Sequence, residues 1–71
     1  MEKKFKSPYS LKDERQMCAF HNSLNEKDKR HYAAVEADKL GHGGITYIAE
    51  LFGCSRLTIN AGLEEIKKKN I

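Results

Sequence analysis

Cysteine, proline and tryptophan are scarce in this sequence, which contains two cysteines, one proline and no tryptophan among 71 residues. Two cysteines are too few for a disulfide framework. Cys18 and Cys54 each lie in an apolar or helical context, where a reduced cysteine packs as a small hydrophobic residue. These absences favour a reduced protein, and we expect it to work in the cytoplasm.

Long apolar runs are also absent. No run approaches the roughly 18 residues that span a membrane. Residues 1–6 lead into no apolar segment of the kind found in secretory signals. We therefore expect neither a membrane partner nor export.

The chain is short for an enzyme. A domain of 71 residues buries only about 60% of the surface that its unfolded chain exposes, which leaves little scaffold to hold an active site. We expect one non-catalytic domain without a cofactor or a small-molecule substrate. Cys18 and His21 are closely spaced, but no second pair among His31, His42 and Cys54 completes a zinc-ligand pattern, so we expect no metal.

Excess charge is small, at +3, but it is unevenly distributed. Lys3, Lys4 and Lys6 crowd one end and residues 67–69 are all lysine, whereas the intervening stretch 41–63 carries only one acidic and one basic residue. Lysine runs are typical both of solvated tails and of arms that bind phosphate. We interpret residues 1–9 as a basic leader and residues 10–71 as one helical domain.

Capping signals mark two helices in the first half of the chain. Ser10 followed by Asp13 has the spacing of a capping box and predicts a helix over about 11–23. Met17, Phe20 and Leu24 recur at helical spacing and form one apolar stripe. Asn25 is a good N-cap, and Gly41 a good terminator, for a second helix over 26–40. Its apolar arc consists mainly of small residues: Ala33, Ala37 and Leu40 share one face, flanked by Ala34 and Tyr32.

This small-residue arc permits close approach of other helices. We therefore expect the second helix to be the central support of a bundle, with Tyr32 and Val35 turned toward the first helix. Each histidine is expected at a surface: His21 and His31 on partly exposed helix faces, and His42 in the glycine-rich connection.

Residues 45–52 fit either a strand or a helix by periodicity. The residues that follow favour a helix, because Gly53 breaks the segment, Ser55 can cap a new helix, and Ile59, Leu63 and Ile66 continue at helical spacing. The sequence thus predicts an all-α bundle of about four helices.

The last two helices match a helix-turn-helix over residues 45–64, extending to about 66. This motif needs a small residue in its first helix, a glycine in the turn and apolar residues that lock the pair. Ala49 and Gly53 meet the first two needs, and the lock is formed by Ile48, Phe52, Cys54 and Ile59. Gly62 stands where a larger apolar residue is common, so we expect Leu63 to provide that packing.

A helix-turn-helix of this kind places its second helix in the major groove of DNA. Arg56 can then pair with guanine, Asn60 with adenine, and Leu57 can touch a thymine methyl group. We expect Thr46 to lie at the phosphate backbone, near the start of the first helix of the motif. The full set of predicted DNA-binding residues is Thr46, Ser55, Arg56, Leu57, Thr58, Asn60, Ala61 and Lys67.

Each of these residues also has a simpler interpretation. Arg56 can bind phosphate alone, Asn60 can be an ordinary surface residue, and Leu57 can pack under the first helix. The whole motif can be a helical hairpin in which Ala49 and Gly53 merely permit close packing.

Residues 23–65, with their GHGGI turn and the later GCSRLTI segment, resemble the N-terminal region of DDE-type insertion-sequence transposases of the Rhodopirellula-transposase family. The resemblance implies a domain that recognises transposon ends for a separate RNase H-like catalytic domain, which the 71 residues lack. It leaves open whether the chain is an N-terminal fragment, a stand-alone remnant or a small transcriptional regulator.

The expected partners are double-stranded DNA and either a transposase catalytic domain or a second copy of this chain. A protein-interaction bundle without DNA binding is the alternative.

Overall fold

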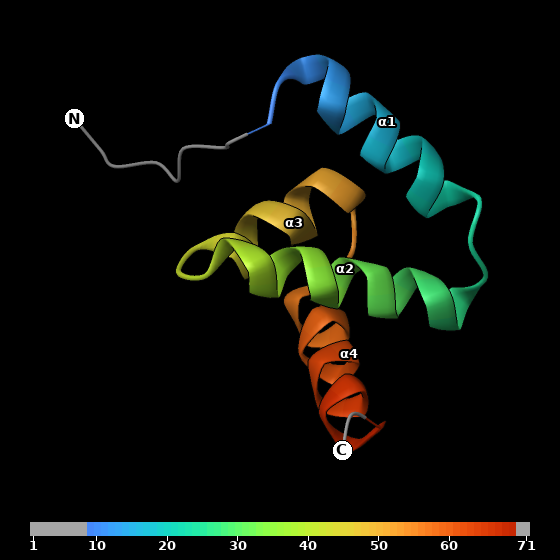
Figure 1. Ribbon diagram of the computed structural model, residues 1–71, viewed down its shortest axis with the longest axis vertical. Coiled ribbons are helices and arrows are strands. Elements are labelled where there is room, and N and C mark those ends of the chain that lie inside the picture. The colour runs from blue at the N-terminus through green and yellow to red at the C-terminus, as the bar shows by residue number, and fades with distance from the viewer. Residues whose placement is uncertain (1–8, 70–71) are drawn as a thin grey trace.

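The computed structural model describes residues 9–69, which form four helices and no strand. The helices are α1 (Leu11–Asn22), α2 (Glu26–Leu40), α3 (Gly44–Phe52) and α4 (Arg56–Lys69) (Figure 1). The all-α prediction is confirmed, and the ambiguous segment after the glycines is a helix. Residues 1–8, with the lysines predicted as a basic leader, and residues 70–71 lie outside the described part of the chain.

The predicted caps start the helices. The side chain of Ser10 accepts a hydrogen bond from the Asp13 backbone N–H at 3.1 Å, and that of Asn25 accepts one from Asp28 at 2.8 Å. At the far end of α2, Gly41 takes a left-handed φ of 72°, which favours glycine and stops the helix. These local signals set the lengths of α1 and α2, and α1 ends at Asn22, one residue earlier than predicted.

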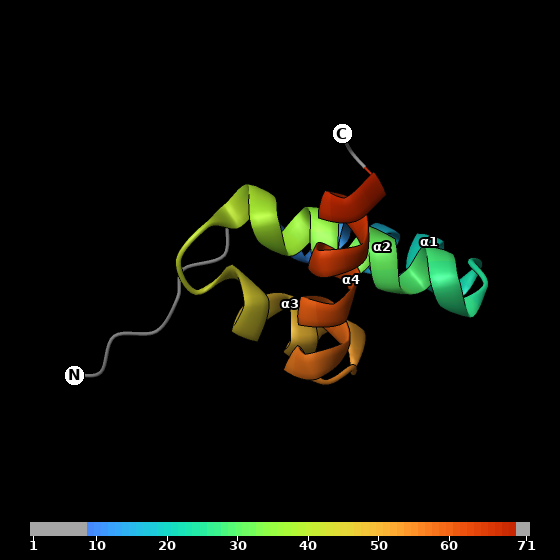
Figure 2. The ribbon, with the colours of Figure 1, turned by 90° about the horizontal axis from the view of Figure 1, so that it is seen from below.

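Helix α2 is the central support, as its small-residue arc predicted. Ala33, Ala34 and Ala37 are all buried. Figure 1 shows α2 crossing the middle of the molecule, with α1 on one side and α4 on the opposite side. Figure 2 views the molecule from the α4 side: α2 lies behind α4, and α3 lies beside α4.

Two glycines let α3 and α4 approach the backbone of α2. A Cβ atom on Gly62 would lie 2.6 Å from the Arg30 carbonyl oxygen, and one on Gly44 would lie 2.5 Å from the Ala37 carbonyl oxygen. Gly62 is therefore itself a buried packing position, which the sequence interpretation missed. Leu63 does pack against the core, as predicted, but it does not replace Gly62.

The helix-turn-helix consists of α3, a turn over residues 53–55 and α4. Ile48 and Ile59, one from each helix, are both fully buried in the core. Gly53 takes a left-handed φ of 70°, and the Cys54 N–H then donates to the Ala49 carbonyl oxygen at 3.0 Å. The predicted lock between the two helices is confirmed.

Aromatic contacts attach α1 to the rest of the bundle. The His21 ring stacks on Phe52 with centroids 4.2 Å apart, and the Phe20 ring meets Tyr32 edge-on at 5.0 Å. Tyr32 therefore faces α1, as predicted. The prediction for His21 is wrong, because this residue is buried, with only 7% of its surface exposed. Val35 is 44% exposed.

Replacing Gly62 tests the close crossing of α2 and α4. Gly62→Ala should lower the free energy of unfolding by about 1 to 3 kcal/mol, the usual range for overpacking, although alanine has the higher helix propensity. Thermal and urea unfolding measure the change. Asn60→Ala, at an exposed position on the same helix, is the control and should be neutral or stabilising. Equal stability of Gly62→Ala and the unaltered chain would contradict the tight crossing.

The burial of His21 predicts a pH-dependent stability. Desolvation, followed by the charge of Lys29, lowers the pKa of His21 below its ordinary value, against weaker opposing effects of Asn22 and Glu26. Because the folded pKa is the lower one, its contribution to stability is present above about pH 6.5 and is lost as pH falls through the folded pKa.

His21→Phe keeps a ring against Phe52 but removes the titrating group. Between about pH 7 and about pH 5, the free energy of unfolding of this variant should therefore fall less than that of the unaltered chain. Urea unfolding at each pH measures both. Parallel curves for the two proteins would refute the assignment to His21.

Candidate nucleic-acid interface

Helix α4 buries one face and exposes the other, as predicted. Ile59 and Gly62 point into the bundle, and the opposite positions are exposed. Helical spacing divides the exposed face into two neighbouring lines. The first, which we call the Arg56 line, carries Arg56, Asn60 and Lys67. The second, the Leu57 line, carries Leu57, Ala61, Glu64 and Lys68.

The Arg56 line borders α3. A shallow hollow between the two helices brings Arg56 together with Thr46 and Ser55, and it is also lined by Ala49, Glu50 and Cys54. Thr46 is exposed in the first turn of α3, whose start has no side-chain cap. The structure thus gathers three of the predicted residues, from both helices of the motif, at one place.

Ser55 and Thr58 act at the start of α4. The Ser55 hydroxyl oxygen accepts a hydrogen bond from the Thr58 backbone N–H at 3.1 Å, and the two hydroxyl groups lie 3.0 Å apart. Both were predicted as DNA-binding residues, but both are engaged in capping the helix. Their effect is to fix the first turn, which carries Arg56 and Leu57.

The Leu57 line borders α2, across a broad open groove. Leu57 is 79% exposed at the edge of this groove, so it does not pack under α1. The groove runs from the end of α1, past the start of α2, to α4, and its lining also includes His21, Lys29, Arg30, Ala33, Phe52, Cys54, Thr58, Ala61 and Glu65. Leu57 and Ala61 therefore face a different side of α4 from Asn60 and Arg56.

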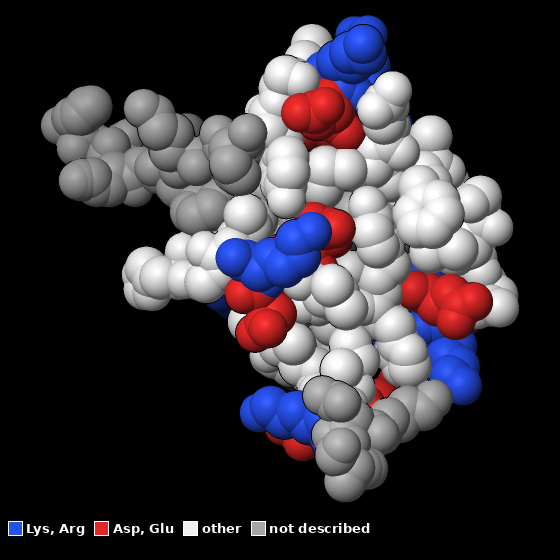
Figure 3. Space-filling model, viewed as in Figure 1, with Lys and Arg blue, Asp and Glu red and all other residues white. Residues whose placement is uncertain are grey.

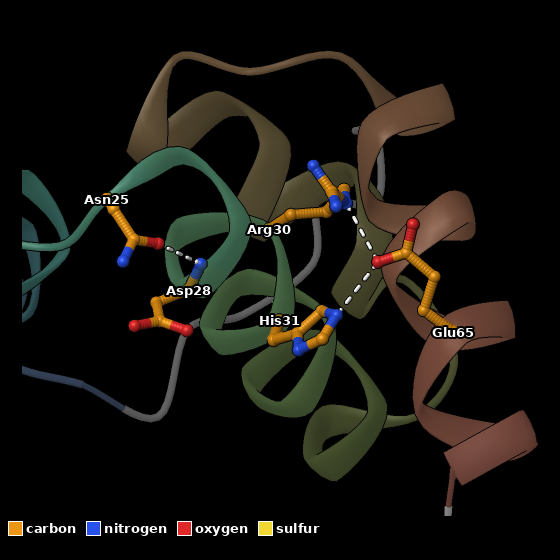
Figure 4. A network of polar contacts seen from close by, with 5 residues as sticks. All are labelled: Asn25, Asp28, Arg30, His31 and Glu65. Carbon is orange, nitrogen blue, oxygen red and sulfur yellow. Dashed lines mark hydrogen bonds and ion pairs between the residues drawn. The ribbon is translucent and has the colours of Figure 1, made fainter.

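A polar network joins α2 to the second half of α4. One carboxylate oxygen of Glu65 accepts hydrogen bonds from Arg30 Nε at 2.9 Å and from His31 Nε2 at 2.8 Å (Figure 4). The hydrogen bond from Arg30, followed by that from His31, lowers the pKa of the Glu65 carboxyl below its ordinary value. Lys27 and Lys68 line the same small hollow.

We call the four basic side chains of this hollow, Lys27, Arg30, His31 and Lys68, the α2–α4 basic cluster. The sequence interpretation missed it, because its members come from two helices that are distant in the chain. Arg30 and Glu65, which meet in the hollow, are 35 positions apart. No local spacing reveals such a pairing. The only sequence feature that indicated a close crossing of α4 with another helix was Gly62, a small residue on an otherwise ordinary helix face.

Charge on the exposed surface of α4 is mixed. Arg56, Lys67 and Lys68 are offset by Glu64 on the same helix and by Glu50 on α3. Figure 3 shows acidic and basic side chains interspersed on the face that carries the outer side of α2. A single-sign patch does not cover that face, so attraction to a polyanion depends on smaller groups of basic residues.

Metal-ligating chemistry has no support among residues 9–69, where no group of three or more histidine, cysteine, aspartate or glutamate side chains is placed to hold an ion. Burial raises the pKa of the Cys54 thiol, which favours its uncharged form.

Within residues 9–69, no helix is both long and apolar enough to cross a membrane.

Comparison of the chain with models of protein families, with curated proteins and with solved structures finds no match. The transposase resemblance therefore stays a prediction from the sequence.

Proposed function

We propose that this domain binds double-stranded DNA, with α4 lying in the major groove. The observation that carries the proposal is the exposed first half of α4, held by the locked helix-turn-helix, with Arg56 and Asn60 on one line beside Thr46 of α3. A helix with its side chains is about 10–12 Å across and fits a groove about 12 Å wide.

The exposed side chains suit base edges of different kinds. The Arg56 guanidinium can donate two hydrogen bonds to guanine, and the Asn60 amide can pair with adenine. Leu57, at 79% exposure, can meet a thymine methyl group. Thr46 and Lys67, which flank this surface, can bind phosphate and set the position of the helix without selecting a sequence.

Affinity in this arrangement comes mainly from phosphate contacts, because the surface of α4 is nearly neutral. A single domain then binds weakly, and selective recognition needs a second DNA-binding unit. The resemblance of residues 23–65 makes the ends of a transposon the proposed target. The additional unit would be a second copy or a transposase catalytic domain, acting in the cytoplasm where bacterial DNA lies.

A second candidate function is assembly with another protein. The exposure of four large apolar residues, Leu57 at 79%, Leu11 at 64%, Phe20 at 53% and Val35 at 44%, favours it. These residues are spread over three helices, α1, α2 and α4, and single exposed apolar residues are common on protein surfaces. DNA binding is the stronger proposal because it also accounts for Arg56 beside Thr46, and for Asn60 one turn further along the same exposed line of α4.

DNA binding by this domain should depend steeply on salt. Each phosphate contact contributes about −0.9 to the slope of log affinity against log salt concentration on duplex DNA. Fluorescence anisotropy with a random-sequence duplex, from about 20 to 200 mM salt, measures this slope. We expect measurable binding at the low end that falls by more than tenfold. The absence of binding to any duplex at low salt would sink the DNA proposal.

Removal of Arg56 should separate base recognition from charge. On a duplex selected by the unaltered domain, Arg56→Ala should weaken binding by about 1 to 3 kcal/mol and relax the preference at one base pair. Arg15→Ala on α1, which removes the same exposed side chain elsewhere, is the control and should leave that preference intact. An equal loss for Arg56→Ala on selected and random duplexes would reduce Arg56 to a phosphate contact.

A further inference from the structure

The α2–α4 basic cluster is assembled by the close crossing at Gly62. The Arg30 carbonyl oxygen and the stem of the Arg30 side chain both lie against Gly62, so any side chain there would push α2 away. Without this approach, Arg30 and His31 would not reach Glu65 one turn further along α4. Positive charge from α2 and α4 is therefore concentrated by packing.

The cluster carries more positive than negative charge. Lys27, Arg30 and Lys68 are cations at neutral pH and share their hollow with one carboxylate, that of Glu65. Arg30 contacts this carboxylate through Nε alone, and a terminal nitrogen of its guanidinium points away from Glu65 (Figure 4). A guanidinium edge beside two lysines suits the oxygen atoms of a phosphate.

The position of the α2–α4 basic cluster relative to α4 also suits binding to a backbone phosphate of the duplex. When a helix fills the major groove, the two phosphate backbones border it on either side. Thr46 of α3 flanks α4 on the Arg56 side, and the cluster flanks α4 on the side of Leu57 and Ala61, where the groove from α2 opens. With α4 in the major groove as proposed, these two flanks would face the two strands.

We propose that the α2–α4 basic cluster binds backbone phosphate of the DNA strand on the α2 side of α4, with Arg30, Lys27 and Lys68 as its ligands. This inference rests on the proposed DNA binding and adds to it a phosphate contact in which α2, outside the helix-turn-helix, supplies Lys27 and Arg30. It assigns α2 a role in binding besides its role in the core. Thr46 and Lys67 contact the strand on the Arg56 side of α4, and the cluster supplies the contact to the other strand.

A double substitution tests the site without disturbing the core, since Lys27 and Lys68 are exposed. Lys27→Ala with Lys68→Ala should weaken binding to a random duplex at low salt several-fold. The same double variant should also make the salt slope shallower, by about 0.9 for each phosphate that the domain no longer binds.

A matched double variant is the control for total charge. Lys12→Ala with Arg15→Ala removes the same charge from α1, at the opposite end of the molecule from α4 (Figure 1), and should leave the slope unchanged. Circular dichroism checks that both double variants fold.

The possible outcomes distinguish failure of the phosphate site from failure of the proposed DNA binding. Duplex binding with the same slope for both double variants would overturn the cluster as a phosphate site and leave DNA binding by α4 intact. Failure of the unaltered chain to bind any duplex would overturn both.

Inorganic phosphate distinguishes a strand phosphate from a free one. At constant ionic strength, about 10 mM phosphate in place of chloride should leave the backbone amide signals of Lys27, Arg30 and Lys68 in place in nuclear magnetic resonance spectra, whereas duplex DNA should shift them. Saturable shifts with phosphate alone would overturn the assignment to DNA.

Discussion

The close packing of α3 and α4 on the small residues of α2 is the constraint on which the rest of the structure depends. Ala33, Ala34 and Ala37 provide a surface without bulk, and Gly44 and Gly62 bring the other two helices to within van der Waals contact of its backbone. Because both approaches are made to one rigid helix, they also fix α3 relative to α4. The spacing between Thr46 and Arg56 follows from this packing as well as from the turn at Gly53.

The attachment of α1 is of another kind. It is made by side chains: His21 stacks on Phe52, Phe20 meets Tyr32, and the Cys18 thiol donates to the Leu51 carbonyl oxygen at 3.4 Å. Tyr47 of α3 also donates to the carboxylate of Glu14. None of these interactions lies at a glycine crossing. We therefore regard α1 as a cover over the aromatic side of the core.

The sequence predicted what local rules determine. Ser10, Asn25 and Ser55 cap helices because their side chains reach backbone N–H groups nearby in the chain, and Gly53 allows a conformation that other residues resist. The exposed face of α4 followed from helical spacing. By contrast, burial of His21, packing at Gly62 and the Glu65 network depend on helices distant in the chain. Periodicity within one helix says which residues share a face, but it does not say what covers that face.

On α4, the residues that hold the helix and the residues that face outward are different residues. Ile59 and Gly62 are fixed by their surroundings, since one fills the core and the other touches a carbonyl oxygen of α2. Leu57, Asn60 and Ala61 are exposed and constrain nothing inside the bundle. Exchange of these outward residues can therefore change what α4 contacts without loss of the fold. In evolutionary terms, a duplicated copy of this domain can change the surface that α4 presents and keep its core.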